Sequence, residues 1–168
     1  MGRQTLSMVD ARPLKTRRSE LDVMRVIRLV RNEFNVNSQR IYCFGFSMGG
    51  AGSLHLALRN PNLFAALGLA APAVGVPGEI PIFATQEKLR ALTDVPTIVV
   101  QGKLDAPVPV EQTRQLVDDM RKASMEVKYL ELPRCGHRPP QSATLRELIK
   151  YLAVACKKKP KCQTAGLR

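Results

Sequence analysis

The stretch Arg40-Ile41-Tyr42-Cys43-Phe44-Gly45-Phe46-Ser47-Met48-Gly49-Gly50-Ala51-Gly52 decides the fold of this chain. An apolar run typical of a strand gives way, at the G-x-S-x-G pattern of residues 45–49, to small residues typical of a helix. A sharp strand-to-helix turn holds a serine hydroxyl clear of the backbone, and glycines let neighbouring segments approach the bend. The N-terminus of the following helix favours negative charge beside Ser47. Ser47 is therefore a candidate nucleophile and the Met48 N–H a candidate oxyanion donor; in the alternative interpretation, the serine only tightens a turn.

Strand-like and helix-like segments alternate on both sides of this turn. We interpret the stretch at 97–102 as a continuous apolar run, which is typical of a strand buried on both faces of a parallel sheet. The periodicity predicts helices at 19–34, 48–59, 85–92, 109–123 and 141–155, and strands at 40–45, 64–70, 97–102 and 126–132. We therefore expect an α/β fold with a mostly parallel sheet of about four strands and helices on both faces.

The 168 residues fit one domain, and the positive charge lies at its ends. We expect a single domain over 1–156 that includes an irregular basic arm at 1–18, followed by a basic, disordered tail at 157–168. Most of the net charge of +12 falls in residues 1–40 and 150–168. Such ends could contact nucleic acid or another anionic surface. No nucleic-acid-binding motif accompanies them, so solvated helix faces and a frayed tail are favoured and no nucleic-acid partner is expected.

Neither a membrane span nor a metal site is indicated. The sequence has no apolar run of about 18 residues, and its start lacks the apolar core of a signal peptide. We expect a cytoplasmic protein, or a secreted one if a signal segment lies upstream of Met1. The four cysteines do not have metal-binding spacing. Cys43 lies in a predicted strand and Cys135 in a loop, while Cys156 and Cys162 could pair in an oxidising compartment. No metal or organic cofactor is expected.

A nucleophilic serine needs a general base, and the chain has two histidines. His55 lies on the helix that follows Ser47, about 12 Å along its axis at about 1.5 Å per residue, which is too far for proton transfer. His137 follows the last predicted strand, at the carboxyl edge of the sheet where the Ser47 turn also opens. His137 is therefore the candidate base, and an incidental loop histidine is the alternative.

The histidine in turn needs an orienting carboxylate. Asp105 follows the strand at 97–102 at its carboxyl end, whereas Asp94 precedes that strand and lies at the wrong edge. Asp118 and Asp119 lie in the middle of a predicted helix, where charge pairing on a solvated face is expected. Asp105 is thus the candidate acid. The order Ser47, Asp105, His137 is the one associated with α/β-hydrolases.

Three motifs carry a resemblance to that family over residues 19–153. Residues 45–52 with 60–66, the acid-bearing stretch 101–110 and the histidine loop 132–137 resemble the polyhydroxyalkanoate-depolymerase, feruloyl-esterase and prolyl-oligopeptidase-like branch of the α/β-hydrolases. The resemblance implies the α/β-hydrolase fold and a Ser-His-Asp triad. In that family several strands precede the nucleophile turn, and one of their loops donates a second oxyanion N–H. Here neither those strands nor an HG-like loop is found before Ser47.

This difference has two consequences for what we expect. The second oxyanion donor has no identifiable source, and the loss of one such donor costs about 10²–10³ in rate. The edge of the first strand would be left uncovered, which makes a homodimer through that edge conceivable. A fragment of a longer hydrolase, a reduced natural variant and a subunit completed by a partner all fit this pattern.

The sequence therefore predicts a carboxylesterase-type serine hydrolase with a small-molecule ester substrate. Short-chain acyl or aryl esters suit the apolar segment 71–92, which we expect to overhang the site. The alternatives are a peptidase or thioesterase of the same fold, or a non-catalytic binding protein that keeps the scaffold.

Overall fold

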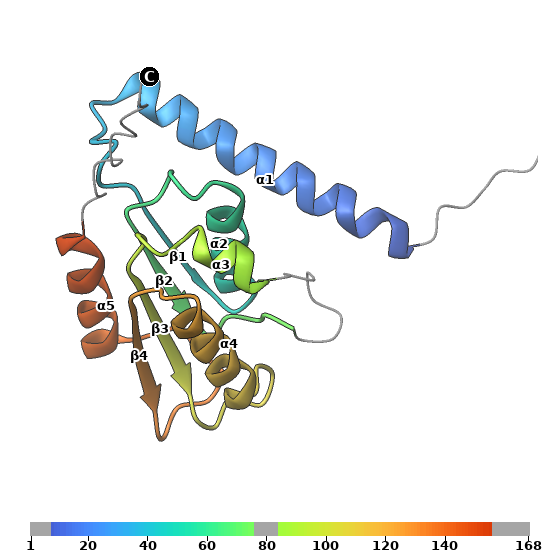
Figure 1. The fold of residues 1–168 in the computed structure, drawn as a ribbon, viewed down its shortest axis with the longest axis vertical. Helices are drawn as coiled ribbons and strands as arrows, with labels where there is room; N and C mark the ends of the chain where they lie inside the picture. The colour runs from blue at the N-terminus through green and yellow to red at the C-terminus, as the bar shows by residue number, and fades with distance from the viewer. Residues whose placement is uncertain (1–7, 76–83, 156–168) are drawn as a thin grey trace, which may run out of the picture.

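The structure is a computed structural model that describes residues 8–75 and 84–155, with side chains from Arg18 onward. Five helices and four strands alternate in this part of the chain (Figure 1). Their bounds are α1 (Met8–Glu33), β1 (Tyr42–Phe46), α2 (Met48–Arg59), β2 (Ala66–Ala70), α3 (Gln86–Arg90), β3 (Thr97–Gly102), α4 (Val110–Lys122), β4 (Val127–Leu132) and α5 (Ser142–Val154).

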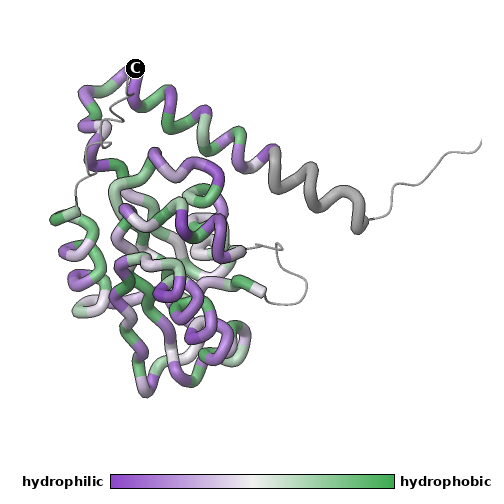
Figure 2. Tube along the Cα trace, in the orientation of Figure 1, coloured by the Kyte–Doolittle hydropathy of each residue, from purple (hydrophilic) through white to green (hydrophobic). Residues whose placement is uncertain are grey.

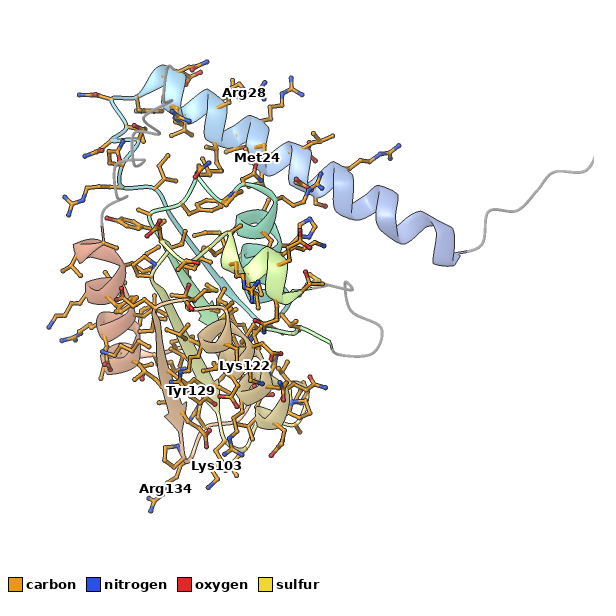
Figure 3. All side chains as sticks on the ribbon, viewed as in Figure 1. Met24, Arg28, Lys103, Lys122, Tyr129 and Arg134 are labelled. Carbon is orange, nitrogen blue, oxygen red and sulfur yellow. The ribbon has the colours of Figure 1, made fainter. Side chains whose placement is uncertain are left out.

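The four strands form one parallel sheet in the order β1-β2-β3-β4. Gly45 of β1 pairs with Leu69 of β2, and Val100 of β3 pairs with Leu130 of β4. Because all four strands run in the same direction, the segments that follow them meet at one edge of the sheet. Figure 3 shows this edge at the end marked by Lys103 and Arg134, which follow β3 and β4. The predicted α/β fold is confirmed.

Helices cover both faces of the sheet, as predicted. In Figure 1, α5 lies on one side, and α2, α3 and α4 lie on the other. Successive strand residues point to opposite faces. Leu67, Leu69 and Val99 therefore join the larger core beneath α2 and α4. On the opposite face, Ile98 and Val100 pack with Leu148 and Leu152 of α5. Every residue of β2 and β3 is buried, which fixes the register of the strands that carry the site.

Helix α1 corrects one sequence prediction. Residues 8–18, expected as part of an irregular arm, belong to a helix that begins at Met8. Pro13 and the lack of an apolar stripe argued against a helix there. However, most of these residues have good helix propensity, and extending a helix costs less than starting one. The remainder of the predicted arm, residues 1–7, lies outside the described part of the chain.

One side of α1 contacts the body, and its other side is exposed. Ile27 packs against the larger core, and Glu20 accepts hydrogen bonds from α2. Figure 2 shows apolar and polar residues alternating along the helix. Among the side chains of α1 from Arg18 onward, the exposed large apolar ones are Leu21, Val23, Val26, Leu29 and Val30. None of the α1 side chains that the structure describes is fully buried, so this part of the helix lies on the surface of the body.

Several predictions concern residues beyond the described ranges. The tail at 157–168 and the Cys156–Cys162 pair lie outside them, as do residues 76–83 of the predicted overhang. Within the described part, no helix is both long and apolar enough to cross a membrane.

Candidate active site

Ser47 lies in a strained turn between β1 and α2. Its φ of 56° and ψ of −121° are unusual for a residue with a side chain, and such a conformation costs about 1–3 kcal/mol. Backbone hydrogen bonds hold it in place. The Ser47 N–H donates to the Ala70 carbonyl at 2.8 Å, and the Ser47 carbonyl accepts from Ala51 and Ala73 at 3.1 and 3.2 Å. The C-terminal end of β2, the segment that follows it and the first turn of α2 therefore hold the Ser47 turn together.

The glycines around Ser47 have different roles. A Cβ on Gly45 would collide with the carbonyl group of Gly49, and a Cβ on Gly50 would lie 3.1 Å from the Ala70 carbonyl oxygen. A Cβ on Gly49 would meet nothing within 4 Å. The close approach of strand and helix thus requires glycine at 45 and strongly favours it at 50. At position 49 the backbone carbonyl approaches Gly45 closely, but a side chain on residue 49 would have room.

Asp105 lies in the loop between β3 and α4, and its side chain is fully buried. Its Oδ1 accepts a hydrogen bond from the Val108 N–H at 2.9 Å. Its two carboxylate oxygens lie 3.0 and 2.9 Å from His137 Nδ1. A carboxylate in this position can hold the imidazole in one orientation and stabilise its positive charge.

His137 is held by contacts between its own loop and the end of β3. The Leu104 N–H donates to the Cys135 carbonyl at 2.9 Å. Gly102 leaves no room for a side chain, because a Cβ there would collide with the Cys135 carbonyl and lie 2.8 Å from the Gly136 oxygen. Phe46 directly precedes Ser47, and the centroid of its ring lies 4.8 Å from the centroid of the His137 imidazole. The histidine loop therefore packs against both of the other site segments.

These contacts bring Ser47, His137 and Asp105 into one hydrogen-bonded chain. His137 Nε2 lies 3.0 Å from Ser47 Oγ, while Nδ1 faces Asp105. With the proton on Nδ1, the imidazole donates to Asp105, and its free Nε2 can accept the serine proton. The His137 side chain is 23% exposed, whereas that of Asp105 is fully buried. The arrangement can perform nucleophilic attack assisted by a general base.

The Met48 N–H stays the candidate oxyanion donor. Met48 is the first residue of α2, and the N–H groups of a first helical turn have no acceptor within the helix. A second donor from a strand preceding β1 is not available within residues 8–75 and 84–155, since β1 is the first strand there. The source of that donor therefore stays unassigned.

The rejected candidates lie away from the site. His55 Nε2 lies 3.3 Å from Glu20 Oε2 and joins α2 to α1. Asp94 precedes β3, at the opposite edge from Asp105. Asp118 and Asp119 pair with basic residues one turn later on α4 at 3.9 and 3.7 Å, as expected for a solvated helix face.

Two cysteines lie near the site segments without forming a metal centre. Burial raises the pKa of the Cys43 thiol in β1. Cys135 Sγ accepts a hydrogen bond from Arg138 Nε at 3.3 Å. No cluster of metal-ligating side chains occurs among the residues that the structure describes.

Sequence reasoning missed two contributors. Phe46 is a variable position of the G-x-S-x-G pattern, so nothing marked its contact with the imidazole. Gln101 was counted as part of a buried strand, but its fully buried amide bonds to the loop that carries Asp105. A lone polar residue at the end of an apolar strand, four residues before a candidate acid, was the available signal.

The comparisons with known proteins point to one family. A model of the Esterase family matches residues 23–131. The chain is 32% identical over 111 residues to "Cutinase est1" of Thermobifida alba, which covers 66% of this chain and 33% of that relative. It is 46% identical over 43 residues to "Esterase LipC" of Mycobacterium tuberculosis, which covers 25% of this chain and 11% of that relative. The chain thus spans about a third of the length of the cutinase.

Solved structures agree on the fold. The structure of a thermostable esterase superimposes with a TM-score of 0.67 at 26% identity, covering 83% of this chain and 37% of that one. The structure of esterase PE8 gives a TM-score of 0.62 at 19% identity, covering 87% of this chain and 67% of that one. The latter shows the shared fold alone. These comparisons do not distinguish the predicted branch of the α/β-hydrolases, which stays a prediction.

Proposed function

The chain belongs to the Esterase family and has the α/β-hydrolase fold, and from this premise we propose that it carries a serine esterase site for carboxylic esters. One observation carries the proposal. Ser47 Oγ, the His137 imidazole and the Asp105 carboxylate form a continuous hydrogen-bonded chain at the carboxyl edge of the sheet. The names of the similar proteins, cutinases and esterases, support the same chemistry.

In the proposed reaction, Ser47 Oγ attacks the ester carbonyl carbon while His137 Nε2 takes its proton. The carbonyl oxygen becomes the oxyanion of a tetrahedral intermediate, which the Met48 N–H and the N-terminus of α2 stabilise. Collapse breaks the bond to the alcohol oxygen, which leaves with the proton from His137. An acyl-serine remains. Water then attacks it with His137 again as base, which releases the carboxylic acid and restores Ser47.

The proposed substrate is a small ester with a short acyl chain or an aryl group. The Ala73 N–H bonds to the Ser47 carbonyl, so the segment Ala71–Val74 lies directly beside the nucleophile. This segment consists of alanine, proline and valine, and Phe46 adds an aromatic ring on the side of His137. An apolar group of modest size suits these neighbours. No metal or cofactor has a role in the proposed steps.

The experiment compares hydrolysis of p-nitrophenyl butyrate by the purified chain and by Ser47→Ala. We expect turnover by the chain and loss of nearly all of it in Ser47→Ala, with Ser38→Ala in the turn before β1 as the matched control that keeps it. A Ser47→Ala rate equal to that of the unsubstituted chain would refute the proposal. A p-nitrophenyl thioester and a peptide p-nitroanilide run in parallel test the alternatives. Preference for either one would replace the esterase assignment.

A further inference from the structure

A buried amide joins the strand, the loop and the helix that surround Asp105. Gln101, in the last part of β3, has no exposed surface. Its Nε2 donates to the carbonyl oxygens of Val108 at 2.9 Å and of Gly102 at 3.3 Å. These two carbonyls belong to the two ends of the loop that carries Asp105. One side chain thus connects the point where the chain leaves the sheet with the point where it enters α4.

Val108 links this amide to the carboxylate. Its carbonyl accepts from Gln101, and its N–H donates to Asp105 Oδ1 at 2.9 Å. Val108 is itself buried, so its backbone has little freedom once both bonds are made. A shift of Val108 away from Gln101 would move the N–H that orients Asp105. The same oxygen, Oδ1, also lies 3.0 Å from His137 Nδ1.

Thr113 holds the other end of the amide. Its hydroxyl, on α4, donates to Gln101 Oε1 at 2.9 Å, and Thr113 is buried as well. Because the carbonyl oxygens of Val108 and Gly102 can only accept, the NH₂ group of the amide must face them, and the amide oxygen then accepts from Thr113. A buried polar group without partners is costly, so this satisfied network specifies one arrangement of the loop.

We propose that Gln101, oriented by Thr113, is a positioning residue that sets the Asp105 carboxylate against His137 through the backbone of Val108. The inference rests on the proposed function, because it concerns the geometry of that site. Gln101 would touch neither substrate nor the reacting atoms. Its removal should therefore affect activation of Ser47 more than binding of the ester, since a displacement of about 1 Å in a catalytic group can cost about 10²-fold in rate.

The test is a double-mutant cycle between Gln101→Met and Asp105→Asn. Methionine keeps most of the side-chain length but has no amide. For Gln101→Met we expect kcat for p-nitrophenyl butyrate to fall about 10- to 100-fold with KM changed less than about twofold. In the Asp105→Asn background the same substitution should change kcat less than about threefold, because the carboxylate through which Gln101 acts is already gone.

Other outcomes separate the inference from the proposed function. Suppose that Asp105→Asn lowers kcat and that Gln101→Met then lowers kcat of Asp105→Asn by the same factor as it lowers kcat of the unsubstituted chain. Gln101 would then act independently of Asp105, and the inference would be wrong. If Asp105→Asn turns over like the unsubstituted chain, the triad itself is wrong. A rise in KM with unchanged kcat for Gln101→Met would also overturn the inference.

A milder variant covers the case in which Gln101→Met fails to fold. Thr113→Val keeps the amide but removes the hydroxyl that orients it. We expect a smaller loss of kcat in the same direction, on the order of threefold to tenfold, that again disappears in Asp105→Asn. A Thr113→Val variant that folds and keeps the full kcat would contradict the proposed role of the hydrogen bonds around Gln101.

Discussion

The imidazole of His137 contacts both of the other side chains of the proposed triad. It lies 3.0 Å from the nucleophile and 2.9 Å from the carboxylate, and Phe46 lies against its ring. His55, the other histidine, contacts Glu20 on α1. The two residues share the same chemistry and differ in surroundings, so they form a matched pair for mutagenesis.

We predict that His137→Ala lowers kcat for p-nitrophenyl butyrate by about 10²–10⁴, the usual contribution of a general base. His55→Ala should leave kcat within about twofold, because a partly exposed contact between α1 and α2 contributes to stability rather than to the reaction. Steady-state kinetics of both variants provide the measurement. Equal losses in the two would mean that His137 has no special role.

The thiol of Cys43 gives a prediction with a pH dependence. Burial in β1 raises its pKa, and the thiolate is the form that alkylating agents attack. In the native protein Cys43 should therefore resist iodoacetamide through the usual range of thiol titration and react only at higher pH or on unfolding. Peptide mass spectrometry of protein alkylated at several pH values checks this. Alkylation of native Cys43 near neutral pH, at the rate of unfolded protein, would contradict the packing of this thiol against the core.

At the scale of the element, the turn between β1 and α2 depends on how closely strand and helix approach. A Cβ at 45 would collide with backbone atoms of Gly49, whereas a Cβ at 49 would meet nothing within 4 Å. Both positions are glycine in the G-x-S-x-G pattern, yet the structure gives only one of them a steric reason. Alanine substitutions at positions 45 and 49 therefore test the geometry of the turn.

We expect Gly45→Ala to lower the free energy of unfolding by about 1–3 kcal/mol or more, the range for overpacking against atoms that cannot move. Gly49→Ala should leave it unchanged or raise it by up to about 1 kcal/mol, because alanine favours the helix more than glycine does. Urea unfolding followed by circular dichroism measures both. If Gly49→Ala proves as destabilising as Gly45→Ala, the geometry of the turn is wrong.

The elements also show how much the sequence could predict. The bounds predicted for α2 and β3 agree with the structure, because clear turn residues and a continuous apolar run mark them. The start of α1 was wrong, because residues 8–18 have helix propensity without an apolar stripe. That Ser47, Asp105 and His137 lie together could be predicted, because parallel strands bring their carboxyl ends to one edge of the sheet. The contacts of Gln101 and Phe46 depend on side-chain packing across segments, which no local pattern encodes.

At the scale of the whole molecule, apolar side chains are exposed on the first strand of the sheet and on the helix that precedes it. Phe44 of β1, which is at the end of the strand order, is 43% exposed. Val26 and Val30 of α1 and Phe34, which follows α1, are also exposed. Exposed strand edges and apolar patches favour association with another chain. The homodimer through the sheet edge stays a prediction on these grounds.

Analytical ultracentrifugation over a range of protein concentrations tests the predicted homodimer. We expect association that weakens with Phe44→Lys, because a charge on this edge strand would have to be buried in the dimer. Lys103→Ala, at the carboxyl edge of the sheet, is the control and should associate like the unsubstituted chain. A monomer at every concentration would refute the predicted homodimer.

Covalent labelling is the most direct test of the central claim, that Ser47 is a nucleophile activated by His137 and Asp105. The purified chain is treated with a fluorophosphonate, and the adduct is located by peptide mass spectrometry. The account predicts one adduct, on Ser47, that forms at least about 10²-fold more slowly in His137→Ala. An adduct on another residue, or labelling of Ser47 at the same rate without His137, would contradict it.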